Sequence, residues 1–191
     1  MEDLKNEILK LYEQQESLMK EKYDRSLSFQ DGLFDRFERA KRLGFGEDAS
    51  IYNSALVFGN VRVGVKTWIG PYVILDGSGG DINIGEYCSI SAGVHIYTHD
   101  SVMWALSGGK ESYSKGNVNI GSHTYIGAQS IIKSGINIGK MCVIGANSFV
   151  NNNIEDNSIV VGSPAKKIGT VMLVEEKIKL EYFSDKTIPL L

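Results

Sequence analysis

The chain of 191 residues is long enough to form one domain with a buried core, and its content of 42% hydrophobic residues is ordinary for a globular protein. Its formal net charge of -3 does not favour nucleic acid or an anionic membrane as a partner. The sequence contains no apolar run long enough for a membrane span, and its acidic amino terminus is unlike a signal peptide. These features predict a cytoplasmic protein without a membrane span.

The first 48 residues are predicted to form a helical cap. One helix is predicted at the amino terminus, where apolar residues fall close to one face: Leu4, Ile8, Leu11, Tyr12, Leu18 and Met19. A second helix is predicted from Asp31 to Leu43, with Gly44 as its carboxyl-terminal stop. A helical lid would cover the open end of the repeats that follow. The alternative is a coiled coil that binds a partner, although its heptads are not sustained.

Residues 49–169 are organised by a period of six. Aliphatic residues recur at that spacing in three blocks: Ile51, Val57, Val63, Ile69 and Leu75; Ile84, Ile90 and Ile96; and Ile120, Ile126, Ile132, Ile138, Ile144 and Val150. A unit of six residues corresponds to a short strand and a corner, and three units make one triangular coil. We therefore predict an all-β fold, a left-handed parallel β-helix. A β-sandwich with coincidental spacing is the alternative.

Small residues mark the corners of the predicted coils. Glycine follows the aliphatic residue in seven hexads, and we interpret it as relieving the backbone constraint at the bend. Cys88 and Cys142 occupy the position of small residues in two hexads. This placement indicates packing residues rather than a disulfide or a metal pair.

Two segments interrupt the period. The first, residues 76–81, is rich in glycine and shifts the phase by three residues, which predicts a turn with an exposed carboxylate. Two interpretations of Asp76 remain open: it belongs to a simple corner loop, or it lies on an edge that contacts an acceptor molecule. The second interruption, residues 97–117, ends where the period returns at Ile120, so it predicts a long loop extruded from one coil.

The extruded loop is the candidate site of chemistry. It carries Tyr97, Trp104 and Leu106, so we expect it to pack on something rather than to extend into solvent. His99 stands at its entrance beside Asp100, and an imidazole can take a proton from a hydroxyl or an amine. The other two histidines, His95 and His123, are predicted to point outward and to be structural.

The final segment, residues 170–191, alternates charged and apolar residues and ends in Ile188-Pro189-Leu190-Leu191. It predicts a short helix or an arm that lies against the coils or a neighbouring subunit.

The sequence resembles the hexapeptide-repeat acyltransferases. The resemblance is carried by the hexads, by the Thr98-His99 entrance of the loop and by the closing run Val161-Gly162-Ser163-Pro164-Ala165-Lys166-Lys167-Ile168. In layout the chain is similar to the galactoside and maltose acetyltransferases and to the sugar acetyltransferases of surface-polysaccharide pathways. The resemblance implies a homotrimer with acetyl-CoA in the groove between neighbouring β-helices. It also implies that His99 is the general base.

Two departures from the family pattern concern the acceptor. The galactoside branch has Gly-His-Pro at the junction, whereas this chain has Thr98-His99-Asp100. The asparagine that holds the sugar in that branch has no clear counterpart here. We assign acceptor binding to Asp76, Tyr97 and Trp104. Asp100 or a backbone carbonyl would hold the tautomer of His99.

The resemblance also suggests where the acyl donor would bind. Gly127-Ala128 and Gly145-Ala146 stand eighteen residues apart, hence on one face of successive coils, where small residues would let a pantetheine arm approach the backbone. Lys166 and Lys167 would suit the CoA phosphates. The alternative to CoA binding is that the Gly-Ala pairs serve only hexad packing and that the lysines lie in a solvated turn. A backbone N–H near Ser91 or Gly93 is a candidate donor to the oxyanion.

The expected function is an acetyl-CoA-dependent O-acetyltransferase that acts on a sugar or a glycan precursor by direct transfer, with no metal. N-acetylation of a nucleotide-linked amino sugar is the main alternative. A zinc enzyme resembling the carbonic anhydrases of this fold would use all three histidines, but His95 and His99 are one residue closer than in that family's pair. A β-helix without catalytic activity is the remaining alternative.

Overall fold

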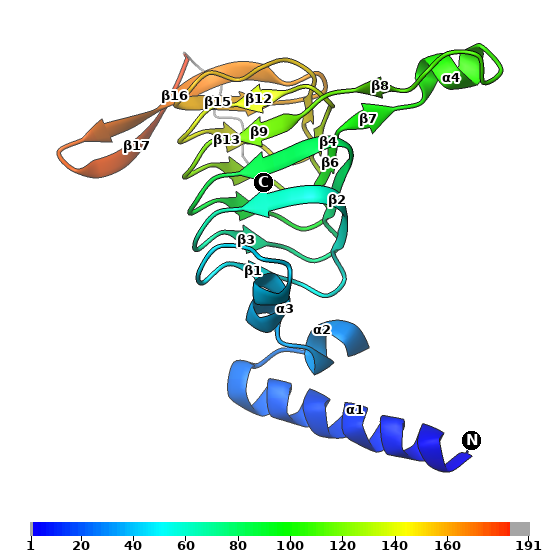
Figure 1. Cartoon of the computed structure of the whole chain (residues 1–191). Coiled ribbons are helices and arrows are strands. Elements are labelled where there is room, and N and C mark those ends of the chain that lie inside the picture. The colour runs from blue at the N-terminus through cyan, green and yellow to red at the C-terminus, as the bar shows by residue number, and fades with distance from the viewer. Residues whose placement is uncertain (1, 184–191) are drawn as a thin grey trace.

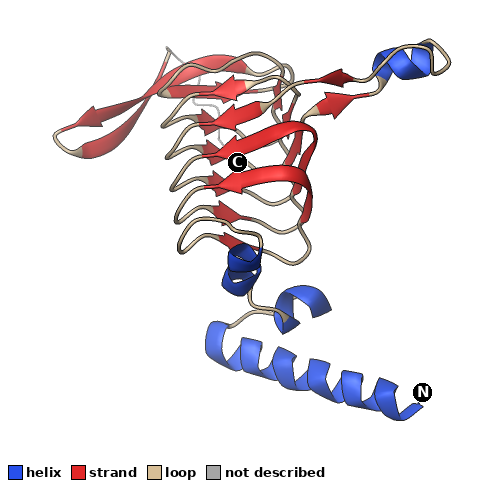
Figure 2. Cartoon of the chain, viewed as in Figure 1, coloured by secondary structure: helices blue, strands red, loops and turns tan. Residues whose placement is uncertain are grey.

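The computed structural model describes residues 2–183. Figure 1 shows a triangular stack of short strands with helices below it, an arm that leaves one side and a hairpin that leaves the other. The strands and their corners make up most of the molecule (Figure 2). This is the predicted left-handed β-helix.

The stack has three faces. The first face contains β1 (Ser50–Ile51), β3 (Trp68–Ile69), β5 (Ser89–Ile90), β10 (Tyr125–Ile126), β13 (Val143–Ile144) and β15 (Ser158–Val161). The second contains the first parts of β2 (Leu56–Val63) and β4 (Ile74–Ile84), then β6 (His95–Tyr97), β11 (Ile131–Ile132) and β14 (Phe149–Val150). The third contains the last parts of β2 and β4, then β9 (Val118–Ile120) and β12 (Asn137–Ile138).

The register explains the period of six. Strands of one face pair in parallel so that aliphatic residues stack, as Ile126 does on Ile90 and Ile144. These three side chains are fully buried. The predicted inward orientation of the aliphatic residues is therefore confirmed, and the core is a column of isoleucine, valine and leucine inside the triangle.

The role predicted for the glycines was wrong. None of the seven glycines that follow an aliphatic residue has a positive φ. The left-handed conformations at the corners belong instead to residues such as Lys66, His123 and Asn147, with φ of 55°, 61° and 56°. A Cβ atom at Gly127 would lie 2.5 Å from the backbone nitrogen of Ala146 in the next coil. Glycine is required because neighbouring coils approach too closely for a side chain.

The turn predicted at residues 76–81 is also wrong. These residues belong to β4, an eleven-residue strand that passes round the corner of the triangle beside β2. The pairing shifts register between Gly59 and Val61, which accommodates the extra residues. The side chain of Asp76 is only 16% exposed, so its carboxylate does not face open solvent.

The predicted second helix is two helices. They are α2 (Phe29–Leu33) and α3 (Arg36–Arg42). The chain breaks between them because the Asp35 side chain accepts hydrogen bonds from the backbone N–H groups of Phe37 and Glu38 and so starts a new helix. Gly44 follows the second helix with a φ of 72°, in agreement with its predicted role as a stop.

Only part of the helical region covers the coils. Ala40 of α3 and Phe45 join the buried core at the open end of the first coil. The Arg39 guanidinium donates to the carbonyls of Tyr52 and Ala55, which satisfies backbone groups at that end. Burial lowers the pKa of Arg39. The first helix, α1 (Glu2–Tyr23), buries no residue and lies beyond α2 (Figure 1). The predicted lid is therefore α3 and not α1.

The carboxyl-terminal segment forms a hairpin. It consists of β16 (Lys166–Val174), which pairs antiparallel with β15, and β17 (Lys177–Tyr182). The boundary predicted at residue 170 falls inside β16, and as far as residue 183 the tail is a strand hairpin and not a helix. The run Ile188-Pro189-Leu190-Leu191 lies outside the described residues.

The two cysteines are free and buried, as predicted for packing residues. The Cys88 thiol donates to the carbonyl of Gly121 at 3.3 Å, and the Cys142 thiol donates to that of Glu155 at 3.1 Å. Burial raises the pKa of both thiols above the ordinary value.

We predict that Gly85→Ala destabilises the fold, because the added Cβ would lie 2.5 Å from the backbone nitrogen of Ser122. Overpacking of this kind costs about 1–3 kcal/mol. For a chain of this size each kcal/mol corresponds to roughly 2–4 °C in Tm. Thermal unfolding followed by circular dichroism measures the shift. Gly32→Ala is the matched control, since its nearest neighbour is 4.0 Å away. Equal Tm values for the two variants would contradict the close-approach account.

We predict that Cys88 and Cys142 do not react with an aromatic disulfide reagent at pH 8 in the native protein, and that both react in denaturant. The folded-state pKa of each thiol lies above the unfolded value of about 9.0. Their contribution to stability is therefore present below pH 9 and falls as the pH rises through the folded pKa. Rapid labelling of the native protein would contradict their burial.

Candidate active site

His99 lies where the arm leaves the coils. It is the first residue of β7 (His99–Asp100), which follows β6 and pairs with β8 (Ser114–Lys115) to form the stem of the arm. Its side chain is 27% exposed. The Nδ1 atom is buried and has no hydrogen-bond partner among the described residues. Nε2 is therefore the ring nitrogen that stays accessible to a bound molecule.

A carboxylate stands on the buried side of the ring. Asp76 Oδ2 lies 3.9 Å from His99 Nδ1. The other carboxylate oxygen, Oδ1, accepts hydrogen bonds from the backbone N–H and the hydroxyl of Ser78. Asp76 is thus anchored through one oxygen and directs the second towards the imidazole. Asp100, which we expected to orient His99, instead accepts a hydrogen bond from the backbone N–H of Val102.

The two interruptions of the period lie against each other. The Thr98 hydroxyl is fully buried, donates to the carbonyl of Asp76 at 2.6 Å and accepts from the N–H of Gly79 at 3.0 Å. A Cβ atom at Gly79 would lie 2.5 Å from the Cβ of His99. The first interruption therefore provides both the carboxylate and the space for the histidine of the second.

The arm carries aromatic side chains over His99. The Tyr113 ring stacks on the imidazole with centroids 6.0 Å apart, and the Trp104 indole meets Tyr113 edge-on at 5.8 Å. Apart from these contacts the arm is open to solvent. The expectation that the loop packs on something is not met within a single copy of the chain, where the exposed residues include every member of α4 (Val102–Leu106). Figure 1 shows that helix at the tip of the arm.

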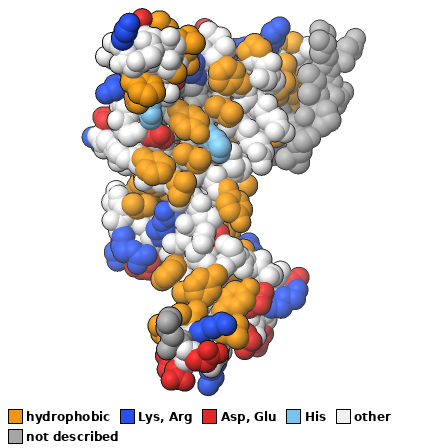
Figure 3. All heavy atoms as spheres, turned by 90° about the vertical axis from the view of Figure 1, so that its right-hand side faces the viewer, with side chains coloured by type: hydrophobic (Ala, Val, Ile, Leu, Met, Phe, Trp, Pro, Cys, Tyr) orange, Lys and Arg blue, Asp and Glu red, His pale blue; other side chains and the backbone are white. Residues whose placement is uncertain are grey.

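A groove of about 490 Å³ begins at His99 and crosses the second face of the stack. It is lined by Tyr97, His99, Asp100, Val102, Met103, Ser114, Ile131, Lys133, Ser134 and Phe149. Tyr97, Ile131 and Phe149 come from β6, β11 and β14, three strands stacked in that order. The groove therefore has a mainly apolar floor parallel to the stack, with a lysine on it. Figure 3 shows this side of the molecule, where histidine side chains lie among hydrophobic ones.

The residues predicted to bind the cofactor do not line this groove. Gly127-Ala128 and Gly145-Ala146 stack as predicted, and Asn147 N–H donates to the carbonyl of Ala128 at 2.9 Å. They lie at the corner between the first and second faces. Lys166 and Lys167 begin β16, and the Lys167 ammonium is 3.9 Å from a carboxylate oxygen of Glu155. The upper end of the groove comes near them, because Ala165 N–H donates to the carbonyl of Phe149.

The other sequence candidates contribute less. Ser91 N–H and Gly93 N–H donate to the carbonyls of Ile126 and Pro71 in adjacent coils, so neither is free to bind an oxyanion. His95 Nδ1 lies 3.3 Å from the Tyr97 hydroxyl, and His123 stacks on Tyr87. Among residues 2–183, no group of three metal-ligating side chains is close enough to hold an ion. No helix in the same range is long and apolar enough to cross a membrane.

The sequence analysis did not identify Tyr113, Ser78 and Gly79, which surround His99 and Asp76, or the groove residues Ile131, Lys133 and Phe149. Gly79 could have been noticed as a glycine outside the hexad pattern. Tyr113 carried no signal, because its contact with His99 depends on how the arm folds back.

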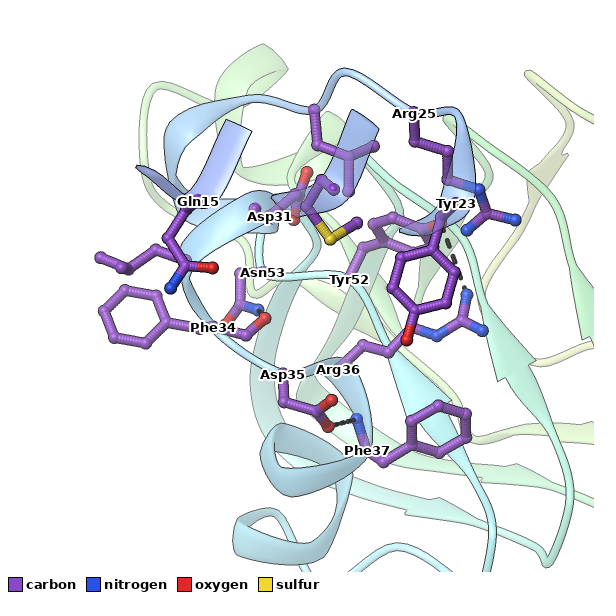
Figure 4. Close-up of a pocket in the computed structure, with 14 residues that line it drawn as sticks. Gln15, Tyr23, Arg25, Asp31, Phe34, Asp35, Arg36, Phe37, Tyr52 and Asn53 are labelled. Atoms are coloured by element: carbon purple, nitrogen blue, oxygen red, sulfur yellow. Dashed lines mark hydrogen bonds between the residues drawn. The ribbon is translucent and has the colours of Figure 1, made fainter. Parts of the chain in front are cut away.

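A second cavity, of about 390 Å³, lies between the helices and the first coil (Figure 4). Arg36 donates to the Tyr52 hydroxyl on one side of it, and Asp35 caps α3 on the other. The Asp31 carboxylate is held by the backbone N–H of Ser54 and by the hydroxyl of Ser28. No histidine, cysteine or serine lines this cavity, whereas the groove on the second face contains His99.

The repeats of this chain are similar to those of known proteins. A family model described as "Hexapeptide repeat of succinyl-transferase" matches residues 117–152. Protein CapG of Staphylococcus aureus is 41% identical over 101 residues, which are 51% of this chain and 57% of that protein. The chain thus spans a little more than half the length of this curated relative.

Three solved structures to which the chain is similar are acyltransferases. A hexapeptide-repeat acetyltransferase from Vibrio cholerae, VCA0836, is 28% identical with a TM-score of 0.64, over 86% of this chain and 92% of that one. The same protein has been solved with acetyl-CoA. AntD, an N-acyltransferase from Bacillus cereus solved with dTDP and coenzyme A, is 26% identical with a TM-score of 0.58, over 70% and 88% of the two chains. A maltose O-acetyltransferase from Clostridium difficile is 26% identical with a TM-score of 0.51, over 85% and 87%.

Proposed function

We propose that this chain, whose repeats match a hexapeptide-repeat family model and whose fold is a left-handed β-helix, is an acetyl-CoA-dependent O-acetyltransferase acting on a sugar or a glycan precursor. The observation that carries the proposal is the histidine at the mouth of the groove. Its Nδ1 atom is buried beside the Asp76 carboxylate, and its ring lines a groove with an apolar floor. The similarity to acetyltransferases of the same fold supports it.

His99 acts as the general base. Its Nε2 atom accepts the proton of the acceptor hydroxyl while the acceptor oxygen attacks the carbonyl carbon of the thioester. When the tetrahedral intermediate collapses, the carbon–sulfur bond breaks and the imidazolium returns the proton to the departing thiolate. The acetyl group passes directly to the acceptor, and no covalent bond to the protein forms.

Asp76 is a positioning residue in this mechanism. A carboxylate beside Nδ1 favours the tautomer that carries its proton on Nδ1, which leaves Nε2 free to accept a proton. It also stabilises the imidazolium that forms during transfer. The distance of 3.9 Å is longer than a hydrogen bond, and catalytic hydrogen bonds often shorten when substrate binds. Asp76 therefore takes the role that we expected of Asp100.

The groove suits the pantetheine arm of the acyl donor. Ile131 and Phe149 offer apolar contact along the stack, and Lys133 adds a positive charge on the same face. Lys166 and Lys167 lie beyond its upper end, where they would meet the phosphates. We propose that the enzyme is a homotrimer and that the Gly127 and Gly145 corners of a neighbouring copy form the opposite wall. That arrangement would bring all the expected donor-binding residues into one site.

Tyr97, Trp104 and the newly identified Tyr113 form the acceptor side. Aromatic rings pack on the apolar faces of sugar rings. Tyr113 stacks on His99, Trp104 meets Tyr113, and Tyr97 lines the same groove as His99. N-acetylation of a nucleotide-linked amino sugar is the second candidate, and the likeness to AntD, which was solved with dTDP, favours it. A thiol-release assay with hydroxyl sugars, amino sugars and nucleotide-linked amino sugars separates the two. The buried native thiols keep the background of that assay low.

We predict that His99→Ala lowers kcat by about 10²–10⁴-fold, the usual contribution of a general base. CoA affinity by calorimetry and assembly mass should not change, because the side chain is partly exposed and makes no hydrogen bond among the described residues. Asp76→Asn should lower kcat by a smaller factor and change its pH profile, since the amide cannot stabilise the imidazolium. A turnover of His99→Ala close to that of the natural protein would reject the assignment.

We predict that Gly79→Ala lowers kcat while CoA binding is retained, because its Cβ would push His99 from beside Asp76. A displacement of about 1 Å can cost roughly 10²-fold in rate. The measurement is kcat and KM with the acceptor found above, with Gly32→Ala as the control. Unchanged kcat in Gly79→Ala would show that the position of the imidazole is not critical.

A further inference from the structure

The longest helix of the protein has an apolar side that its own chain leaves open. The α1 helix has 22 residues and buries none of them. Its apolar residues Leu4, Ile8, Leu11 and Leu18 are 58%, 47%, 40% and 56% exposed. Their spacing of three, four and seven residues puts them on one stripe of the helix. Most of the stability of a helix in a protein comes from packing of its apolar side, so a partner for this side is expected.

Contact with α2 accounts for only the edge of this apolar side. Tyr12 and Met19 face α2, where the Tyr12 ring lies 5.8 Å from that of Phe29. The α2 helix has five residues and reaches only the carboxyl-terminal half of α1. Figure 1 shows the amino-terminal half of α1 extending past α2. The four residues of the stripe therefore keep between 40% and 58% of their surface exposed.

The stripe has a symmetry that suits pairing with an identical helix. Leu4 and Leu18 lie seven residues to either side of Leu11, which is two helical turns in each direction. In an antiparallel pair centred on Leu11, each Leu4 meets Leu18 of the other copy and the two Leu11 side chains meet each other. This is the self-complementary contact that a two-fold axis requires.

The charges of α1 agree with the same arrangement. Its first turn is acidic, with Glu2 and Asp3, and its last turn is basic, with Lys20 and Lys22. Antiparallel pairing brings the acidic turn of each helix beside the basic turn of the other, and it also aligns the helix dipoles favourably. A parallel pair would put like charges together.

These observations favour a second copy over a membrane surface. Helices that lie on anionic membranes carry mainly Lys and Arg on the polar side. Acidic residues outnumber basic ones in α1. We propose that the Leu4-Ile8-Leu11-Leu18 stripe of α1 is a homotypic interface that pairs two copies of this chain in antiparallel orientation. If the catalytic assembly is a trimer, the pairing joins two trimers end to end.

The first test measures the mass of the full chain by light scattering. Leu11→Lys should halve the assembly mass, because a charge at the centre of the stripe cannot be buried against its own copy, while lysine keeps the helix. Leu9→Lys is the matched control, since Leu9 is 51% exposed but lies off the stripe. The ratio of the two masses is the same whether the β-helices assemble as monomers or as trimers. This test therefore does not depend on the proposed homotrimer. Equal masses for the natural protein and Leu11→Lys would overturn the proposal.

The second test determines orientation by disulfide formation. Leu11→Cys alone should cross-link between copies, and a mixture of Leu4→Cys with Leu18→Cys should do so as well, whereas Leu4→Cys alone should not. The native cysteines are 2% and 1% exposed and do not interfere. Self-cross-linking of Leu4→Cys would indicate a parallel pair and overturn the orientation. Binding to phosphatidylserine vesicles that is lost in Leu11→Lys, without a change of mass, would overturn the second copy as the occupant.

Discussion

Backbone contact between successive coils is the constraint on which this structure depends. Gly127 N–H donates to Ile144 and Gly145 N–H to Val160, both at 2.8 Å, and the same contact recurs up each corner. The coils are then so close that a Cβ atom at Gly127 would overlap the next backbone. Position by position, this geometry selects an inward aliphatic residue, then glycine, then a small side chain. The period of six follows from close stacking more than from the conformational freedom of glycine.

The same stacking gives the candidate site its precision. Extra residues in one coil must be accommodated by the neighbouring coils. Here the two irregular segments contact each other at one corner. Thr98, at the start of the arm, bonds to the backbone of Asp76 and Gly79 in the coil below. The carboxylate and the imidazole are thus fixed by rigid strands rather than by a flexible loop, as a positioned base requires. The arm adds only the aromatic rings that cover them.

The ends of the stack are finished in different ways. At the amino-terminal end, α3 covers the core of the first coil, and Arg39 donates hydrogen bonds to backbone carbonyls of that coil. At the other end, β16 closes the first face by antiparallel pairing with β15. The α1 helix and the tip of the hairpin cover neither end of the stack. They remain exposed, with Leu18, Leu173 and Ile178 among their exposed side chains. Elements that do not close the stack are available for contacts between molecules.

The hexads alone predict the triangular coil, the buried aliphatic column, the buried cysteines and the point where the arm leaves, because each hexad encodes its own short strand and corner. They could not determine that Asp76 rather than Asp100 stands beside His99, that Tyr113 stacks on the imidazole, or that the glycines serve close approach. Those features join residues many positions apart through the register of stacked coils. Only the tertiary structure sets that register, since it depends on how two interruptions of different length fit against each other.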